Sequence, residues 1–236
     1  MAYYGGKIWR LPIDGGSPRG IENIQQGEAQ EIPFTVNVDI ELGPEVAFEY
    51  PIDDAPEFTV KQIRDAVPSP DGKKLAFTAL DKLWVMDWPD GTPKRVTNSE
   101  NNEHELVWSP DGKWLAYVNW DGESGNIYKV TASGGIPTKL TAIAGYYRTP
   151  AWSPDGQRIV MSRGSAQHFR EEIGGPASEL VWVSANGGQI NRIAPTEGRA
   201  VPHFTKNPDR IYFSSFSDGL ISMRWDGTDQ KTHVKV

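Results

Sequence analysis

Six side chains of kinds that bind ligands or transfer protons recur near one point of a repeated sequence pattern. Arginine and glutamate form charge-assisted hydrogen bonds, histidine exchanges a proton near neutral pH, and tyrosine offers an aromatic face with a hydroxyl group. Such a set could bind a polar ligand, and a solvated polar surface without a ligand is the alternative interpretation. The six residues are Arg64, His104, Glu105, Tyr147, Arg148 and His203.

The sequence carries no recognisable catalytic or metal-binding motif. His104 stands between Glu103 and Glu105, but neighbouring side chains of a strand point to opposite faces and cannot all converge on one ion. There is no cysteine, no His-x-His pair and no Gly-x-Ser-x-Gly sequence. We therefore expect no catalytic residue, no metal site and no cofactor, and we expect the isolated chain not to be an enzyme.

The tetrapeptide Ser-Pro-Asp-Gly marks an internal repeat. It occurs at 69–72, 109–112 and 153–156, so its prolines are spaced 40 and 44 residues apart, and a degenerate copy without the glycine stands at 206–209. Proline sets φ for the start of a turn, aspartate accepts backbone hydrogen bonds, and glycine takes a positive φ. The three aspartates therefore form turns between antiparallel strands and are not catalytic carboxylates.

Each repeat holds four short strands in about 40 residues, and such units must stack on copies of themselves to bury their apolar faces. This period predicts an all-β fold, a β-propeller of four-stranded blades. The starts of the innermost strands line the central channel of a propeller, and the repeat places the six side chains above there. The expected blades are 61–98, 99–142, 143–195 and 196–236, and we expect Trp108 and Trp152 to pack between neighbouring blades.

The first 60 residues fit the repeat only in part. Residues 1–35 match the outer strands of a partial blade, and alternating apolar residues within 36–60 predict an inserted hairpin or two extended strands. We expect 1–236 to be one domain or a fragment of a longer propeller, about four and a half blades in an open arc. A homodimer would cover its open ends, whereas the competing interpretation is a small ring closed by the N-terminal strands.

Composition narrows the classes of partner. Nine Trp, eight Tyr, 24 Gly and 18 Pro suit many short strands and tight turns, and the net charge is −7. We expect no nucleic-acid binding, because that requires a basic face. No apolar run reaches the roughly 18 residues of a membrane helix, and the first residues do not read as a signal peptide, so we expect no membrane insertion.

At 108–112 and 152–156, Trp-Ser-Pro-Asp-Gly followed by a strand resembles the TolB-like, WD-repeat-like propeller family. The same repeat occurs in propellers of prolyl-oligopeptidase-like and tricorn-like peptidases. Residues 62–72 and 83–87 are similar to the N-terminal propeller of large bacterial proteins that end in an amidohydrolase domain. This resemblance implies a periplasmic or secreted parent protein whose metal site lies in another domain.

Two functions follow as hypotheses. The first is a non-catalytic scaffold or interaction module that binds a protein or peptide at the channel mouth and through loops such as 164–178. The second is an accessory propeller of a larger hydrolase, either an amidohydrolase or a prolyl-oligopeptidase-like peptidase. In that case the propeller gates or positions a separate catalytic domain.

Overall fold

The computed structural model describes residues 2–4, 6–10, 29–41, 43, 55–171 and 177–235. The chain divides into two compact units, Met1–Ala55 and Pro56–Val236. The first unit holds an antiparallel sheet of β1 (Ala2–Tyr4), β2 (Lys7–Arg10) and β3 (Gln30–Ile32). Lys7 and Glu31 form an ion pair of 2.9 Å across β2 and β3.

The second unit consists of four antiparallel sheets, each with its strands in sequence order; we call them blades 1 to 4. Blade 1 comprises β4 (Arg64–Pro68), β5 (Lys74–Ala79), β6 (Lys82–Asp87) and β7 (Lys94–Arg95). Blade 2 comprises β8 (Asn102–Trp108), β9 (Trp114–Trp120), β10 (Gly125–Thr131) and β11 (Thr138–Lys139). Blade 3 comprises β12 (Tyr146–Trp152), β13 (Arg158–Gly164), β14 (Glu179–Ser184) and β15 (Asn191–Pro195). Blade 4 comprises β16 (Arg199–His203), β17 (Arg210–Ser215), β18 (Gly219–Arg224) and β19 (Lys231–Val234).

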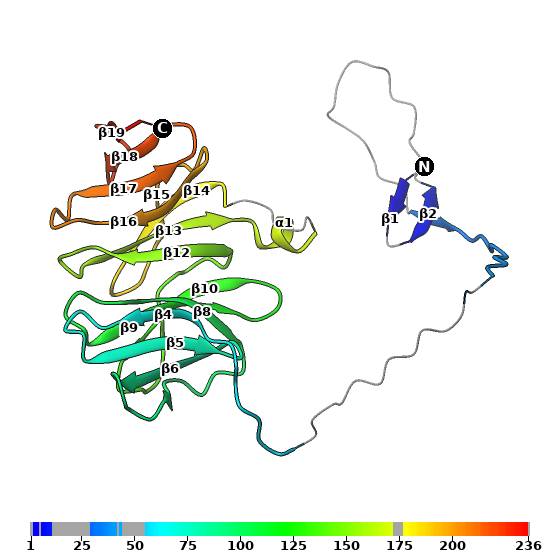
Figure 1. Cartoon of the computed structure of the whole chain (residues 1–236). Helices are drawn as coiled ribbons and strands as arrows, with labels where there is room; N and C mark the ends of the chain where they lie inside the picture. Colours follow the sequence, from blue (N-terminus) through cyan, green and yellow to red (C-terminus); the bar gives the residue numbers. More distant parts are fainter. Residues whose placement is uncertain are drawn as a thin grey trace. The chain divides into compact units, whose positions relative to one another are not determined.

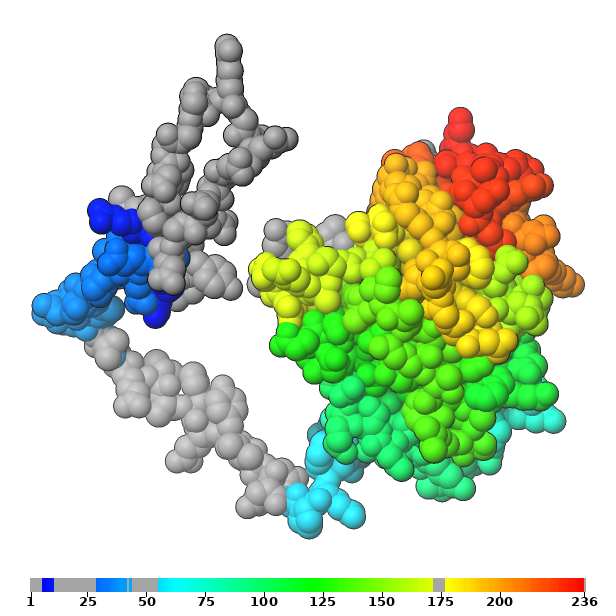
Figure 2. Space-filling view, turned by 180° about the vertical axis from the view of Figure 1, so that it is seen from behind, coloured from blue at the N-terminus to red at the C-terminus, as the bar shows by residue number. Residues whose placement is uncertain are grey.

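The blades stack face to face in sequence order, from the cyan sheet to the red one (Figure 1). Their first strands contact one another in the series β4, β8, β12, β16, so these strands form one common wall. The space-filling view shows the same succession of colours along the outer surface of this unit (Figure 2). This arrangement confirms the predicted all-β fold with propeller-type blades.

The Ser-Pro-Asp-Gly turns join the first and second strands of blades 1, 2 and 3, as the sequence predicted. In blade 2 the Ser109 hydroxyl donates to Asp111 Oδ1 at 2.6 Å and accepts from the Trp114 N–H at 2.9 Å. Gly112 takes a φ of 69°, and its N–H donates to the Ser109 carbonyl at 2.9 Å. The other two turns repeat these bonds, so serine and aspartate serve the turn itself.

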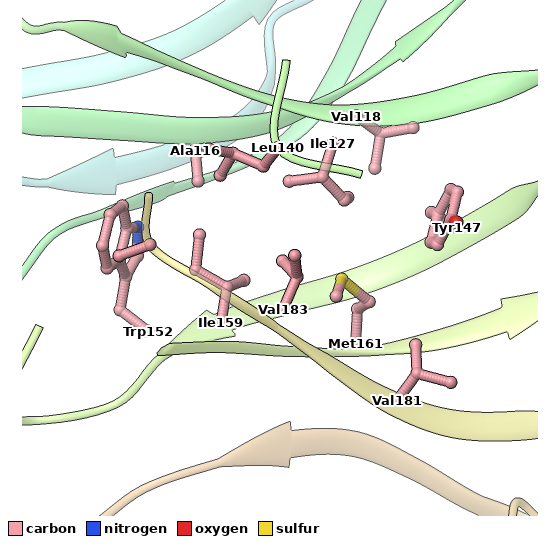
Figure 3. Close-up of a cluster of buried hydrophobic side chains, with 11 residues drawn as sticks. Ala116, Val118, Ile127, Leu140, Tyr147, Trp152, Ile159, Met161, Val181 and Val183 are labelled. Carbon is pink, nitrogen blue, oxygen red and sulfur yellow. The ribbon is translucent and has the colours of Figure 1, made fainter. Parts of the chain in front are cut away.

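The core lies between neighbouring blades. Figure 3 shows side chains of blade 2, including Ile127 and Val118, facing Ile159 and Met161 of blade 3. Trp152 belongs to this cluster and is 8% exposed. Trp108 is 5% exposed in the cluster that joins blades 1 and 2. Both tryptophans therefore pack between blades, which confirms the prediction for this repeat position.

A cation joins blades 3 and 4. The Arg158 guanidinium lies 5.0 Å from the ring centroid of Trp182 in blade 3 and 4.9 Å from that of Trp225, which follows β18 of blade 4. The Trp225 indole N–H donates to the Pro208 carbonyl at 2.7 Å. A guanidinium between two indole rings adds a cation–π contact to the apolar packing of these two sheets.

Two segments differ from a plain repeat. Residues 166–171 form the helix α1 (Ala166–Glu171) between β13 and β14, within the loop 164–178 that the sequence pointed to as a binding loop. The described residues of 36–60, namely 36–41, 43 and 55–60, form no strand. The rest of the expected hairpin lies outside the described residues. Among the described residues, no helix is long and apolar enough to span a membrane.

Candidate functional site

Every blade has the same irregularity near the start of its first strand. The register between the first and second strands shifts there, and one residue takes a positive φ: Asp65 (51°), Glu105 (52°), Thr149 (51°) and Val201 (51°). A β-bulge turns side chains out of the regular alternation. The repeat therefore presents one bulged residue per blade along the wall of first strands.

Two of these bulged residues are acids, and each accepts from the backbone of the next blade. Asp65 Oδ2 accepts from the Glu105 N–H at 2.7 Å. Glu105 in turn accepts from the Thr149 N–H and pairs with the Arg148 guanidinium. We call this series the carboxylate ladder. It stops at Thr149, whose buried hydroxyl has no hydrogen-bond partner among the described residues.

A pocket of about 460 Å³ opens beside the ladder, between the first strands of blades 1, 2 and 3. We call it the mouth pocket. Four of the six residues named from the sequence line it: Arg64, His104, Glu105 and Arg148. The other residues that line it are Asp65, Thr78, Asp81, Asn102, Trp120, Tyr146 and Phe169.

The remaining two sequence candidates lie elsewhere. Tyr147 is fully buried in the core between blades 2 and 3, at one end of the cluster in Figure 3, and its hydroxyl donates to the Ile143 carbonyl. The sequence placed it at the channel mouth, but the alternation of β12 points Tyr146 to the pocket and Tyr147 to the core. His203 is exposed in blade 4, where its ring lies 5.9 Å from that of Tyr212.

Three aromatic side chains form one wall of the mouth pocket. Phe169 of α1 stacks on Tyr146 at 4.0 Å between ring centroids, and Trp120 meets both rings edge-on at 5.4 and 6.3 Å. Arg170 of α1 pairs with Glu123, which fixes the helix against the turn after β9. The repeat did not reveal this wall, because Phe169 comes from an insertion and Trp120 stands at the end of its strand.

Arg64 and His104 supply polar groups that other side chains leave free. Arg64 forms no ion pair among the described residues. Burial lowers the pKa of His104, although the carboxylates of Glu105, Asp65 and Asp81 act in the opposite direction. His104 is therefore neutral at pH 7 and offers one donor and one acceptor. In contrast, the Arg148 guanidinium is bound to Glu105 and to the Tyr146 hydroxyl.

The mouth pocket can thus bind a ligand that carries both polar and apolar groups. Arg64 provides charge, His104 and Asn102 provide hydrogen bonds, and the aromatic wall provides apolar area. Among the described residues, no group of three or more histidine and acidic side chains is placed to hold a metal ion.

A family comparison agrees with the blade geometry. Residues 63–175 match the family model PD40, described as the TolB beta propeller domain. This stretch carries a TolB-like propeller repeat. It covers blades 1 and 2 and the first part of blade 3, where the Ser-Pro-Asp-Gly turns lie.

Known relatives share this repeat over part of their length. The chain is 27% identical over 114 residues to the uncharacterized peptidase YuxL of Bacillus subtilis, covering 44% of this chain and 17% of that protein. It is 28% identical over 157 residues to an uncharacterized protein of Agrobacterium fabrum, covering 63% of this chain and 49% of the relative. The chain thus spans less than half the length of either relative.

The structure of a putative TolB from Agrobacterium tumefaciens is similar to this chain, with a TM-score of 0.60 and 23% identity. The match covers 74% of this chain and 62% of that one. At this identity the likeness shows the fold, which is the propeller architecture already seen in the blades.

Proposed function

We propose that the four-blade unit is a non-catalytic interaction module that binds a protein or peptide partner at the mouth pocket. The observation that carries this proposal is the position of Arg64, which forms no ion pair among the described residues, and of His104 beside the aromatic wall of Trp120, Tyr146 and Phe169. Peptides offer carbonyl, amide and carboxylate groups together with apolar side chains, so they match both parts of this pocket.

Selection from a random peptide display library on the intact chain tests the proposal. Peptides that bind the wild-type chain are labelled, and their affinities for the wild type, R64A and W120A are measured by fluorescence anisotropy. We expect each substitution to weaken peptide binding about tenfold, because R64A removes the charged group of the pocket and W120A removes part of its aromatic wall. The matched control is R224A, since Arg224 is an exposed arginine of blade 4 outside the pocket. Equal affinity for all variants would contradict the proposal.

The non-catalytic part of the proposal has its own test. We expect no turnover when the chain is incubated with amide and ester substrates. A turnover that H104A abolishes would contradict this expectation. We also propose the periplasm or the exterior of a bacterial cell as the location, from the resemblance of the repeat, and cell fractionation with an antibody against the chain tests it.

The similarity to the uncharacterized peptidase YuxL favours a second candidate function. The chain covers 17% of that protein, so the propeller would be an accessory domain of a larger hydrolase. The mouth pocket would then face the catalytic domain or pass substrate to it. In the full gene product, R64A should raise KM for long peptides and leave the hydrolysis of a small chromogenic substrate unchanged. Equal effects on both substrates would count against gating by this pocket.

A further inference from the structure

A second hollow lies at the other end of the strands, between blades 2 and 3. It has a volume of about 450 Å³ and is formed where the Ser-Pro-Asp-Gly turns of the two blades come together. We call it the turn groove. The groove shares no residue with the mouth pocket, and its principal lining residues are Pro110, Asp111, Trp114, Trp152, Pro154 and Asp155.

The apolar part of the turn groove consists of indole and pyrrolidine rings from two blades. Trp114 is partly exposed at the start of β9, and Pro110 and Pro154 occupy equivalent positions of the two turns. Flat apolar rings of this kind suit a polyproline-type peptide, whose rings pack on aromatic side chains and whose backbone carbonyls have no internal hydrogen bond.

The turn groove carries charges of both signs. Lys129, which also lines the groove, places its ammonium 4.7 Å from the ring centroid of Trp114 and donates to the Ala185 carbonyl at 2.6 Å, so its charge is held on that side of the groove. Asp155 uses Oδ1 to accept from the Ser153 hydroxyl and the Gln157 N–H, while its other oxygen has no hydrogen-bond partner among the described residues. A carboxylate fixed in a turn, with one oxygen free, is suited to a basic side chain.

One buried donor at the turn groove has no acceptor. Trp152 is 8% exposed, and its indole Nε1 has no hydrogen-bond partner among the described residues. At the same repeat position in blade 2, the Trp108 Nε1–H donates to the Val67 carbonyl at 3.0 Å. A buried N–H group without a hydrogen bond destabilises the fold, so a ligand that supplies an acceptor would remove part of this free-energy penalty. This nitrogen is buried, so a ligand carbonyl reaches it only when the neighbouring side chains move.

We propose that the turn groove binds an extended, proline-containing peptide segment with one basic side chain. A proline ring packs on Trp114, the basic side chain pairs with Asp155, and a peptide carbonyl accepts from the Trp152 indole N–H. This site is independent of the mouth pocket, so either one can fail without the other.

The probe is a fluorescein-labelled peptide, Gly-Pro-Pro-Arg-Pro-Pro-Gly, titrated with the intact chain. A matched peptide carries citrulline in place of arginine, which keeps the shape and removes the charge. We expect the arginine peptide to bind about tenfold more tightly. D155N and W114A should each weaken binding of the arginine peptide by a similar factor. The matched control is D71N, because Asp71 occupies the same turn in blade 1 outside the groove.

Indole N–H signals in a ¹H–¹⁵N spectrum of the same titration locate the bound peptide. We expect the Trp152 signal to move downfield as it gains an acceptor, and the Trp114 signal to shift as well. Shifts at Trp120 instead would place the peptide in the mouth pocket and overturn the turn-groove proposal. Equal binding of the two peptides, or an equal loss in D71N and D155N, would also overturn it.

Discussion

At the scale of single residues, the two buried tryptophans make the sharpest stability prediction. Trp108 and Trp152 fill equivalent positions between blades, and we expect W108A and W152A each to lower the free energy of unfolding by about 3–5 kcal/mol. The loss in free energy of unfolding should be larger for W108A, because this variant also loses the hydrogen bond to the Val67 carbonyl. Urea titration measures the free energy of unfolding of both variants. The control is W88A, since Trp88 is 54% exposed, and a loss near zero in W108A would contradict the prediction.

The turn aspartates predict how stability depends on pH. The hydrogen bond from the Ser109 hydroxyl, and then that from the Lys113 N–H, lower the pKa of Asp111 in the folded chain. A lowered folded pKa contributes stability above the unfolded value, and this contribution is lost as the pH falls through the folded pKa. We therefore expect D111N to flatten the fall in urea midpoint below about pH 4. An unchanged acid profile in D111N would contradict this.

At the scale of elements, the carboxylate ladder joins first strands of neighbouring blades, which belong to different sheets. Glu105 accepts from the Thr149 N–H and pairs with Arg148, so E105A leaves both donors of blade 3 without this acceptor. We expect a loss of about 1–3 kcal/mol in the free energy of unfolding. E105Q keeps an acceptor for the Thr149 N–H and should lose less. Hydrogen exchange of the Thr149 amide tests the mechanism, and unchanged protection in E105A would contradict it.

At the scale of the whole molecule, the second unit has two outer sheet faces. Close packing between sheets in the described residues joins consecutive blades, and blades 1 and 4 lie at opposite ends of the stack (Figure 1). We propose that a second copy covers these faces in a homodimer, because open faces and strand edges favour association. Light scattering at micromolar concentration should give twice 26.2 kDa. A monomer at that concentration would contradict the proposal.

The sequence pattern was sufficient to predict the blades and to name some of the residues that line the mouth pocket. Ser-Pro-Asp-Gly is a local signal, since each turn closes through bonds among residues at most five apart, and strand alternation then assigns the two faces. Arg64, His104, Glu105 and Arg148 were found because the repeat aligns the starts of the first strands. The sequence named Tyr147 where the structure places Tyr146 in the pocket, because a shift of one residue along a strand moves a side chain to the opposite face of the sheet.

By itself, then, the sequence determined the period, the turns, the all-β blades and the tryptophans between them, because each depends on contacts within one repeat or between identical repeats. Only the tertiary structure decided which groups meet across blades. The stacking of Phe169 on Tyr146, the ladder from Asp65 through Glu105, and the turn groove between Trp114 and Asp155 all join residues from different strands or blades. Their meeting depends on the stagger of stacked sheets and on one inserted helix, which no local pattern encodes.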